Sequence, residues 1–323
     1  MTLVASPLPG LPHTLPGAGR RLLLIHNPTA GFRRPGFLRR TVHALRDSGC
    51  RLELRETAAR GDAERFAREA AGVDAVVAAG GDGTVNEVVN GLGARPVPLP
   101  LGVIPLGTAN VLAGELGLPD RPAALAALLA AGPVRLIHPG RAGGRLFTMM
   151  AGAGLDAAVV EGVNPRLKRL TGKGAYVVET MGRLLAGPRP DYTVTVEDAA
   201  GGVERVRAAS CIVAKGHFYG GRFVLAPQAD LGRPQLHACL FECGGRAAAL
   251  AYSAGMVLGL LERLPGFRVL PAVRVGIDGP AGEPVQGDGD VIARLPVEIA
   301  LAPSGLPVIA PPPVRREREA AAA

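Results

Sequence analysis

Tryptophan is absent from this sequence of 323 residues, which also has only eight phenylalanines and four tyrosines. A protein that binds nucleic acid by stacking bases on aromatic side chains would therefore have few residues to use. The net charge of +8 favours anionic partners in general, such as nucleotides and lipid headgroups. Because no recognisable nucleic-acid-binding motif accompanies this charge, we expect no nucleic-acid partner.

Cysteine is scarce, and long hydrophobic runs are missing. Cys50, Cys211, Cys239 and Cys243 show no paired CxxC spacing of zinc ligands, so we expect reduced thiols in a cytoplasmic protein. The first 19 residues contain no Lys or Arg and therefore lack the charged start of a signal peptide. The uncharged apolar stretch at 247–261 has 15 residues, too few to span a bilayer. We expect no membrane-spanning segment.

The composition is that of a globular protein with two domains. Apolar residues make up 48% of the chain and charged residues 20%, and a domain usually takes about 150 residues. We expect a Pro-rich disordered tail at 1–19, an α/β domain at 20–140, a β-rich domain at 141–310 and a second disordered tail at 311–323.

Strands and helices alternate in the first of these domains. Apolar runs predict buried strands at 21–25, 73–79 and 99–104, and the alternation at 51–57 predicts a partly exposed strand. Helical patterns lie between them, at 37–48, at 62–71, from residue 84 onward and up to residue 116. Strands that alternate with helices at this spacing predict a parallel sheet with helices on its faces.

Short strand-like segments dominate the second domain. They lie at 146–150, 192–197, 203–213, 222–225, 235–241, 267–277 and 293–301. Helical patterns interrupt them at 166–185 and 246–264. This arrangement predicts an antiparallel sandwich.

The strongest chemical signal is the motif Gly80-Gly81-Asp82-Gly83-Thr84, which lies between a buried strand and an amphipathic helix. Glycines let backbone N–H groups approach a ligand closely, and the helix N-terminus that follows favours a phosphate. Thr84 could cap this helix, and Asp82 could orient a magnesium ion or a reacting hydroxyl. The alternative is an ordinary turn from strand to helix.

Two further loops follow strands on the same expected edge of the sheet, at 27–31 and 107–110. Ligands of open parallel sheets bind beyond the carboxyl ends of the strands. Three polar, glycine-bearing loops at that edge therefore predict one binding site.

The order of these motifs resembles the diacylglycerol kinase catalytic-domain family, which includes bacterial lipid kinases and sphingosine kinases. The segments that carry the resemblance are 27–31, 80–88, 105–110, 152–157, 173–176, 219–221 and 286–290. It extends from residue 21 to about residue 305. The resemblance implies an N-terminal ATP-binding α/β domain and a C-terminal β-rich lipid-binding domain. It also implies transfer of the γ-phosphoryl group of Mg-ATP to a lipid hydroxyl.

The resemblance also implies roles for single residues. Asp288 would be the general base, with Asp82 as a second catalytic residue. The nucleotide contacts would be Asn27, Thr57, Gly80, Gly81, Asp82, Gly83, Thr84, Asn86, Glu87, Thr108 and Asp290. The alternative for Asp288 is a hairpin turn of the Asp-Gly type, and Asp278-Gly279 is a nearby pair of the same kind.

The sequence departs from the family pattern at four places, one of which is Val111 after Asn110, where many members have Asp. Asp290 stands where the family has Glu. Arg233 and Pro234 follow Pro227-Gln-Ala229, where many bacterial members have an Asp-Gly pair whose Asp helps to hold a structural magnesium ion. Arg233 could replace the charge of this ion. Lys215 and His217 lie in a stretch where family members usually have Asn and Gly. The sequence assigns no metal ligands.

The expected partner is a lipid substrate at a membrane surface, with peripheral association of the protein and a homodimer as an open alternative. An acyl chain could be lined by Leu155, Val159, Val160, Tyr176, Val177 and Met181, and basic residues at 33–40 and 166–173 could hold an anionic membrane. Two other functions stay open. One is an NAD kinase-like enzyme, whose family shares the Gly-Gly-Asp-Gly loop. The other is a catalytically inactive protein that binds lipid or nucleotide.

Overall fold

A computed structural model of the chain describes residues 19–30, 34, 36–154, 157, 191–221 and 223–313. Most of both expected tails lies outside these residues. So do the expected helix at 166–185, the basic group at 166–173 and the six residues expected to line an acyl chain.

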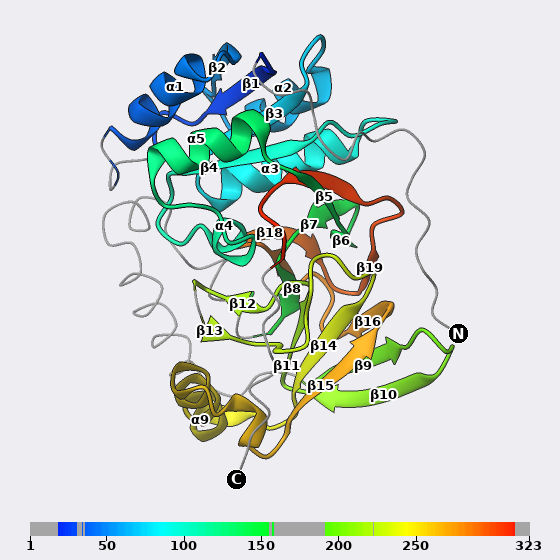
Figure 1. Ribbon diagram of the computed structural model, residues 1–323. Coiled ribbons are helices and arrows are strands. Elements are labelled where there is room, and N and C mark those ends of the chain that lie inside the picture. The colour runs from blue at the N-terminus through cyan, green and yellow to red at the C-terminus, as the bar shows by residue number, and fades with distance from the viewer. Residues whose placement is uncertain are drawn as a thin grey trace.

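The first half of the chain, together with one strand from near the end of the chain, forms a six-stranded, mostly parallel sheet (Figure 1). Its strand order is β2 (Arg51–Glu56), β1 (Arg21–His26), β3 (Ala75–Gly80), β4 (Leu101–Pro105), β20 (Leu306–Ile309) and β5 (Val134–Ile137). The pairs among β2, β1, β3 and β4 are parallel, as expected, and only β5 runs antiparallel to its neighbour β20. The predicted fold class is confirmed for this half.

Helices cover both faces of this sheet because successive side chains of a strand point to opposite faces. Leu23 and Ile25 of β1 pack with α2 (Asp62–Glu69) and α3 (Asp82–Gly93). Leu22 and Leu24 pack with α1 (Phe37–Asp47) and α5 (Pro122–Ala131) on the opposite face. A strand buried on both faces is a continuous apolar run, which is why 21–25 was recognisable in the sequence.

The strand β20 is a feature that the sequence did not predict. It pairs in parallel with β4, through Val308 and Leu101, and antiparallel with β5. The chain therefore returns to the first sheet after it has built the second half of the molecule (Figure 1).

The second half contains two six-stranded antiparallel sheets, as the sequence predicted. One has the order β10 (Val203–Ala208), β9 (Tyr192–Glu197), β16 (Arg274–Asp278), β19 (Val297–Leu301), β6 (Gly140–Ala142) and β7 (Arg145–Phe147). The other has the order β15 (Phe267–Ala272), β14 (Leu236–Phe241), β11 (Ser210–Ala214), β8 (Met150–Ala153), β17 (Pro284–Gly287) and β18 (Asp290–Arg294). Side chains from both sheets, such as Val194 of β9 and Val213 of β11, share one core.

Four expected strands were wrong in one respect, because each is two strands. The segment 203–213 divides into β10 and β11, and 267–277 divides into β15 and β16. The same happens at 146–150 and 293–301, where the pairs are β7 with β8 and β18 with β19. In every case the two strands belong to different sheets. The chain passes from one layer to the other at these corners, and an unbroken pattern of β-forming residues does not reveal a corner.

Smaller elements also lie outside the large sheets. The helix α4 (Val111–Glu115) follows β4, and strands β12 (Phe218–Tyr219) and β13 (Phe223–Val224) form a hairpin. The helix α9 (Gly245–Leu258) ends at Gly259, whose φ of 70° is left-handed, so it is shorter than the expected 246–264. No helix in the described part of the chain is long and apolar enough to cross a membrane.

Candidate active site

The loops after β3 and β4 cross each other at two glycines. A methyl group added to Gly107 would lie 2.6 Å from the Cα of Gly81, and one added to Gly81 would lie 3.3 Å from the Cα of Gly107. A methyl group on Gly80 would lie 2.5 Å from the Thr84 side chain. Close packing of the site therefore leaves no room for a side chain at Gly80 or Gly107, and little room at Gly81.

The loop after β1 joins the same site. The Asn27 amide donates a hydrogen bond to the Thr84 hydroxyl at 3.3 Å, and its carbonyl oxygen accepts from the backbone and side chain of Thr29. The expected capping role of Thr84 is wrong, because α3 begins at Asp82 and its N-cap residue is Gly81. Thr84 is a buried residue of the first turn instead. Gly83, in the same turn, is exposed.

Asp82 connects two of the loops. Its carboxylate accepts hydrogen bonds from the backbone N–H groups of Asn110 at 2.9 Å and Val111 at 2.7 Å. These N–H groups lie at the start of α4, where a carboxylate is favoured. Burial raises the pKa of the Asp82 carboxyl, and the charge of Asp288 adds to the rise while the two hydrogen bonds oppose it. In this structure, Asp82 fixes the loop 107–110.

Asp288 comes from the other half of the chain and reaches the same site. Its Oδ1 accepts hydrogen bonds from the N–H groups of Met149 at 2.8 Å and Met150 at 3.2 Å. Its Oδ2 accepts from the Thr148 N–H at 2.7 Å, the Thr148 hydroxyl at 2.9 Å and the Asn86 amide at 3.1 Å. The carboxylate is thus fixed in position by five donors from α3 and from residues 148–150, which lead into β8.

Asp288 also lies in a hairpin turn, as the alternative interpretation of its sequence predicted, so the turn and the position in the site occur together. Asp288 has a φ of 50° and lies in the turn between β17 and β18. The left-handed conformation is one that Asp tolerates better than most residues. Asn86, expected at the nucleotide, is buried and bridges Asp288 and the Leu146 carbonyl.

Asp290 faces the start of α3. Its Oδ2 lies 3.7 Å from the Arg60 guanidinium, and a methyl group added to Gly83 would also lie 3.7 Å from it. With 41% of its side chain exposed, Asp290 is the carboxylate beside the glycine loop that is open to a ligand.

The remaining expected residues are Thr57, Thr108 and Glu87. Thr57 follows β2 and its N–H donates to the His26 carbonyl, whereas Thr108 is exposed between β4 and α4. The Glu87 carboxylate accepts a 3.2 Å hydrogen bond from the Ala63 N–H and so connects α3 to the start of α2. The residues that sequence reasoning missed are Thr148, Met149 and Met150, which hold Asp288 mainly through backbone N–H groups. No side-chain motif marks such a role.

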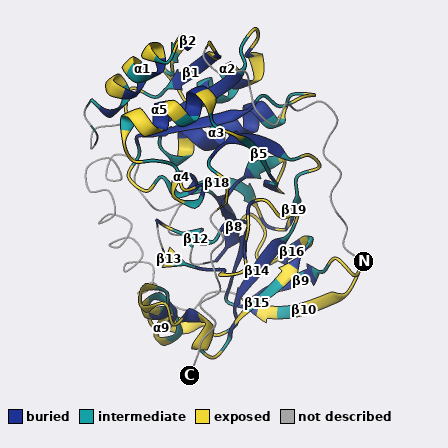
Figure 2. Cartoon of the chain, viewed as in Figure 1, coloured by how far each residue is buried: buried dark blue, intermediate teal, exposed yellow. Residues whose placement is uncertain are grey.

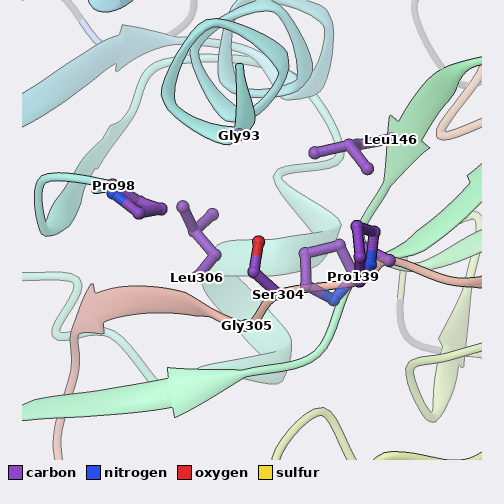
Figure 3. Close-up of a pocket in the computed structure, with 9 residues that line it drawn as sticks. Gly93, Pro98, Pro139, Leu146, Ser304, Gly305 and Leu306 are labelled. Carbon is purple, nitrogen blue, oxygen red and sulfur yellow. The ribbon is translucent and has the colours of Figure 1, made fainter. Parts of the chain in front are cut away.

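A small pocket lies at the other end of α3, around Gly93, Leu146 and Leu306 (Figure 3). All of its lining residues are uncharged, and none of them is a site residue that the sequence predicted. Among the described residues, no three His, Cys, Asp or Glu side chains are grouped so as to hold a metal ion.

Comparisons with known proteins agree with this geometry. The profile of the diacylglycerol kinase catalytic domain matches residues 21–142, and that of the YegS C-terminal NAD kinase beta sandwich-like domain matches residues 149–310. A solved diacylglycerol kinase structure from Bacillus anthracis str. Sterne has a TM-score of 0.73 and 25% identity, with 91% of this chain and 98% of that chain covered.

Curated relatives point in the same direction. A protein of Pseudomonas aeruginosa PAO1 described as "Probable lipid kinase YegS-like" is 32% identical over 90% of this chain and 97% of its own length. The "Diacylglycerol kinase" of Bacillus subtilis is 33% identical over 60% of this chain and 70% of its own length. The matches to YegS-like proteins of Chromohalobacter salexigens and Pseudomonas putida span about half of those relatives. This chain belongs to the lipid kinase family that joins a diacylglycerol kinase catalytic domain to a YegS-type C-terminal domain.

Proposed function

We propose that this protein transfers the γ-phosphoryl group of Mg-ATP to the hydroxyl group of a lipid of the diacylglycerol or sphingoid type. One observation carries the proposal. Asp288, from a hairpin of the second half, is held beside the Gly81–Thr84 loop of the first half through Asn86. A phosphate-binding loop and a fixed carboxylate therefore share one site.

The nucleotide phosphates bind at the start of α3. Its first turn offers backbone N–H groups and the positive end of a helix dipole, and Gly83 leaves this surface open. Asn27 and Thr108 lie on the loops to either side. The exposed carboxylate of Asp290 fits as a ligand of the magnesium ion that the nucleotide carries. That ion would neutralise the negative charge that develops on the phosphate oxygens during transfer.

Asp288 accepts the proton of the attacking hydroxyl. The lipid oxygen forms a bond to the γ-phosphorus, the bond from that phosphorus to the bridging oxygen breaks, and ADP leaves. Most of the catalysis in such reactions comes from positioning and charge neutralisation. A carboxylate held by five donors is fixed in position, and it would give up one of these hydrogen bonds when it takes the proton.

The test is transfer of label from γ-labelled ATP to a total lipid extract, with NAD as a parallel acceptor. We expect a labelled lipid with the wild type and its loss with Asp288→Asn. Asp278→Asn is the matched control, since this exposed Asp also precedes a Gly but ends β16. Label in NADP would replace the proposal by the NAD kinase-like function. ATP binding without transfer would replace it by the inactive binding protein.

We also propose that the protein works while bound to the cytoplasmic surface of a membrane. Support comes from α9, whose outer face carries Leu250, Val257 and Leu258, with 51%, 64% and 68% of these residues exposed. Leu260 beyond the helix and Phe223 of β13 are exposed as well. Figure 2 shows this helix mostly in the colour of exposed residues. An apolar face of this kind, in a family whose substrate is a lipid, suits insertion between headgroups.

Binding to anionic vesicles tests this second point. We expect Val257→Asp combined with Leu258→Asp to reduce co-sedimentation, while Val97→Asp, at an exposed apolar residue before β4, leaves it unchanged. A change in oligomeric mass without a change in vesicle binding would assign the face to a homodimer instead.

A further inference from the structure

Lys215 is a lysine without access to solvent. It follows β11, and its exposed fraction is 0%. Its Nζ donates a hydrogen bond to the carbonyl oxygen of Asp230 at 2.5 Å. Burying an ammonium group is unfavourable unless it is paired, so this position indicates a specific task for the charge.

The carbonyl that Lys215 binds belongs to a loop with further hydrogen bonds of its own. This loop, residues 226–233, connects β13 to the segment before β14. The Asp230 carbonyl also accepts the Arg233 N–H at 3.2 Å, and the Leu231 carbonyl accepts the His138 N–H at 2.8 Å. Ala226 and Leu231 are buried in the core that the two halves share.

The electrostatic surroundings of Lys215 combine two anions with several basic groups. The carboxylates of Asp230 and Glu115 favour the charged ammonium. The half-buried imidazole of His138 and the buried imidazole of His237 have their pKa values lowered by burial and then by the charge of Lys215. The Arg135 guanidinium lies near the same two carboxylates, so Lys215 is one of two cations whose charge they favour.

The family resemblance implies a structural magnesium ion in this segment, and the residues present do not fit one. An ammonium group already binds the Asp230 carbonyl and would repel a divalent cation. The Asp230 carboxylate accepts the Gly232 N–H at 2.8 Å and lies 3.7 Å from the Arg233 guanidinium. Arg233 itself has 74% of its side chain exposed, so it does not supply the interior charge that we expected of it.

Lys215 is also connected to the catalytic carboxylate. The N–H groups of Lys215 and Gly216 both donate to the Met149 carbonyl, at 2.8 and 3.0 Å. The Met149 N–H in turn donates to Oδ1 of Asp288. A shift of Lys215 would therefore be transmitted to Asp288 through one residue.

We propose that the Lys215 ammonium is a built-in cation that orders the loop 226–233 in place of a structural divalent ion, and that it positions Asp288 through Met149. Lys215 is a positioning residue, since it does not reach the reacting atoms. The effect on catalysis rests on the proposed function, whereas the replacement of a metal ion does not.

The first experiment needs no activity. We expect the thermal unfolding temperature of the wild-type chain, without nucleotide, to be the same in MgCl2 and in EDTA. We also expect amide hydrogen exchange at 226–233 to speed up in Lys215→Met and Lys215→Gln. Arg233→Ala is the matched control, because it removes the exposed cation of the same loop. In this variant, amide hydrogen exchange at 226–233 should be as slow as in the wild type. A wild-type chain that Mg²⁺ stabilises, or a loop equally protected in all variants, would overturn the proposal.

The second experiment measures turnover. Displacing a positioned group commonly lowers kcat by on the order of 10- to 100-fold, and we expect this loss in both Lys215 variants with an unchanged KM for ATP. Lys215→Gln retains a hydrogen-bond donor but not the charge. A wild-type kcat in Lys215→Gln with a lowered kcat in Lys215→Met would show that only the hydrogen bond matters, and this would overturn the proposal. If the wild type labels no lipid, the proposed function fails, and the exchange and unfolding results still decide the role of Lys215.

Discussion

Replacing Lys215 by methionine should remove a pH dependence from the stability of this protein. Burial lowers the pKa of Lys215 from 10.5 to about 8. Between these pH values the unfolded chain still binds a proton that the folded chain has released, so the free energy of unfolding rises with pH. At about 1.4 kcal/mol per pH unit, this group alone contributes a rise of roughly 3 kcal/mol. Below about pH 8 the lysine is charged in both states, and the folded state bears the unfavourable burial.

Other groups titrate in the same range, and the comparison of the two proteins removes them. Burial raises the pKa of the Cys211 thiol to about 12, so above about pH 9 the unfolded chain loses thiol protons that the folded chain retains. That effect lowers stability as the pH rises, and it is the same in both proteins. The lost hydrogen bond to Asp230 adds an offset of about 1 to 3 kcal/mol, which the pH profile separates from the titration.

The assay is urea unfolding of the wild type and Lys215→Met at several pH values from 7 to 10, without nucleotide. From pH 7 to pH 10, we expect the free energy of unfolding of the wild type to rise relative to that of the variant by up to about 3 kcal/mol. Profiles that run parallel would refute the reasoning, because they would mean that Lys215 titrates alike in the folded and unfolded chains.

Three further results follow from contacts in the site and from the thiols. Gly107→Ala should raise the KM for ATP and lower stability by about 1 to 3 kcal/mol, since its methyl group would lie 2.6 Å from Gly81. Gly114→Ala is the control: it lies in α4 with no atom within 4 Å of the added carbon, so it should be neutral or slightly stabilising. If both variants lost the same free energy of unfolding in urea, the crossing of the loops would be contradicted. Asp82→Asn should raise the KM for ATP with little change in circular dichroism, because an amide accepts through one oxygen only, and a wild-type KM would show that the loop 107–110 does not need this cap. A thiol reagent should modify one cysteine in the native protein, Cys243, and all four after unfolding, because Cys50, Cys211 and Cys239 are buried; rapid native labelling of two or more would contradict this burial.

The α/β half of the fold was largely predictable from local pattern. The strands β1, β3 and β4 are buried on both faces, so each is an apolar run bounded by polar turns. The periodicity of α1, α2 and α3 was equally clear. β20 was not predicted, because a short apolar segment among prolines does not reveal that it pairs with a strand some two hundred residues earlier.

The sequence proposed residues for the candidate site but not the contacts between them. The motif at 80–84 and the position of Asp288 were visible in the sequence, and the structure brings them together through Asn86. The sequence assigned Asp82 to metal or hydroxyl chemistry, whereas the structure shows its carboxylate on the N–H groups that begin α4. Which acceptor a carboxylate finds depends on loops that meet only after folding.

What the sequence by itself determined is most of the strands and helices of the α/β half and the place of the glycine loop between a strand and a helix, since both depend on neighbours a few residues apart: side-chain periodicity, turn residues and helix ends. The tertiary structure alone decided that Thr148 and Met149 hold a carboxylate 140 and 139 residues away. It also decided that Lys215 lies inside the protein against a carbonyl of a later loop. The physical reason is that backbone N–H and C=O groups are the same at every residue, so only the path of the chain selects which of them will meet a given side chain.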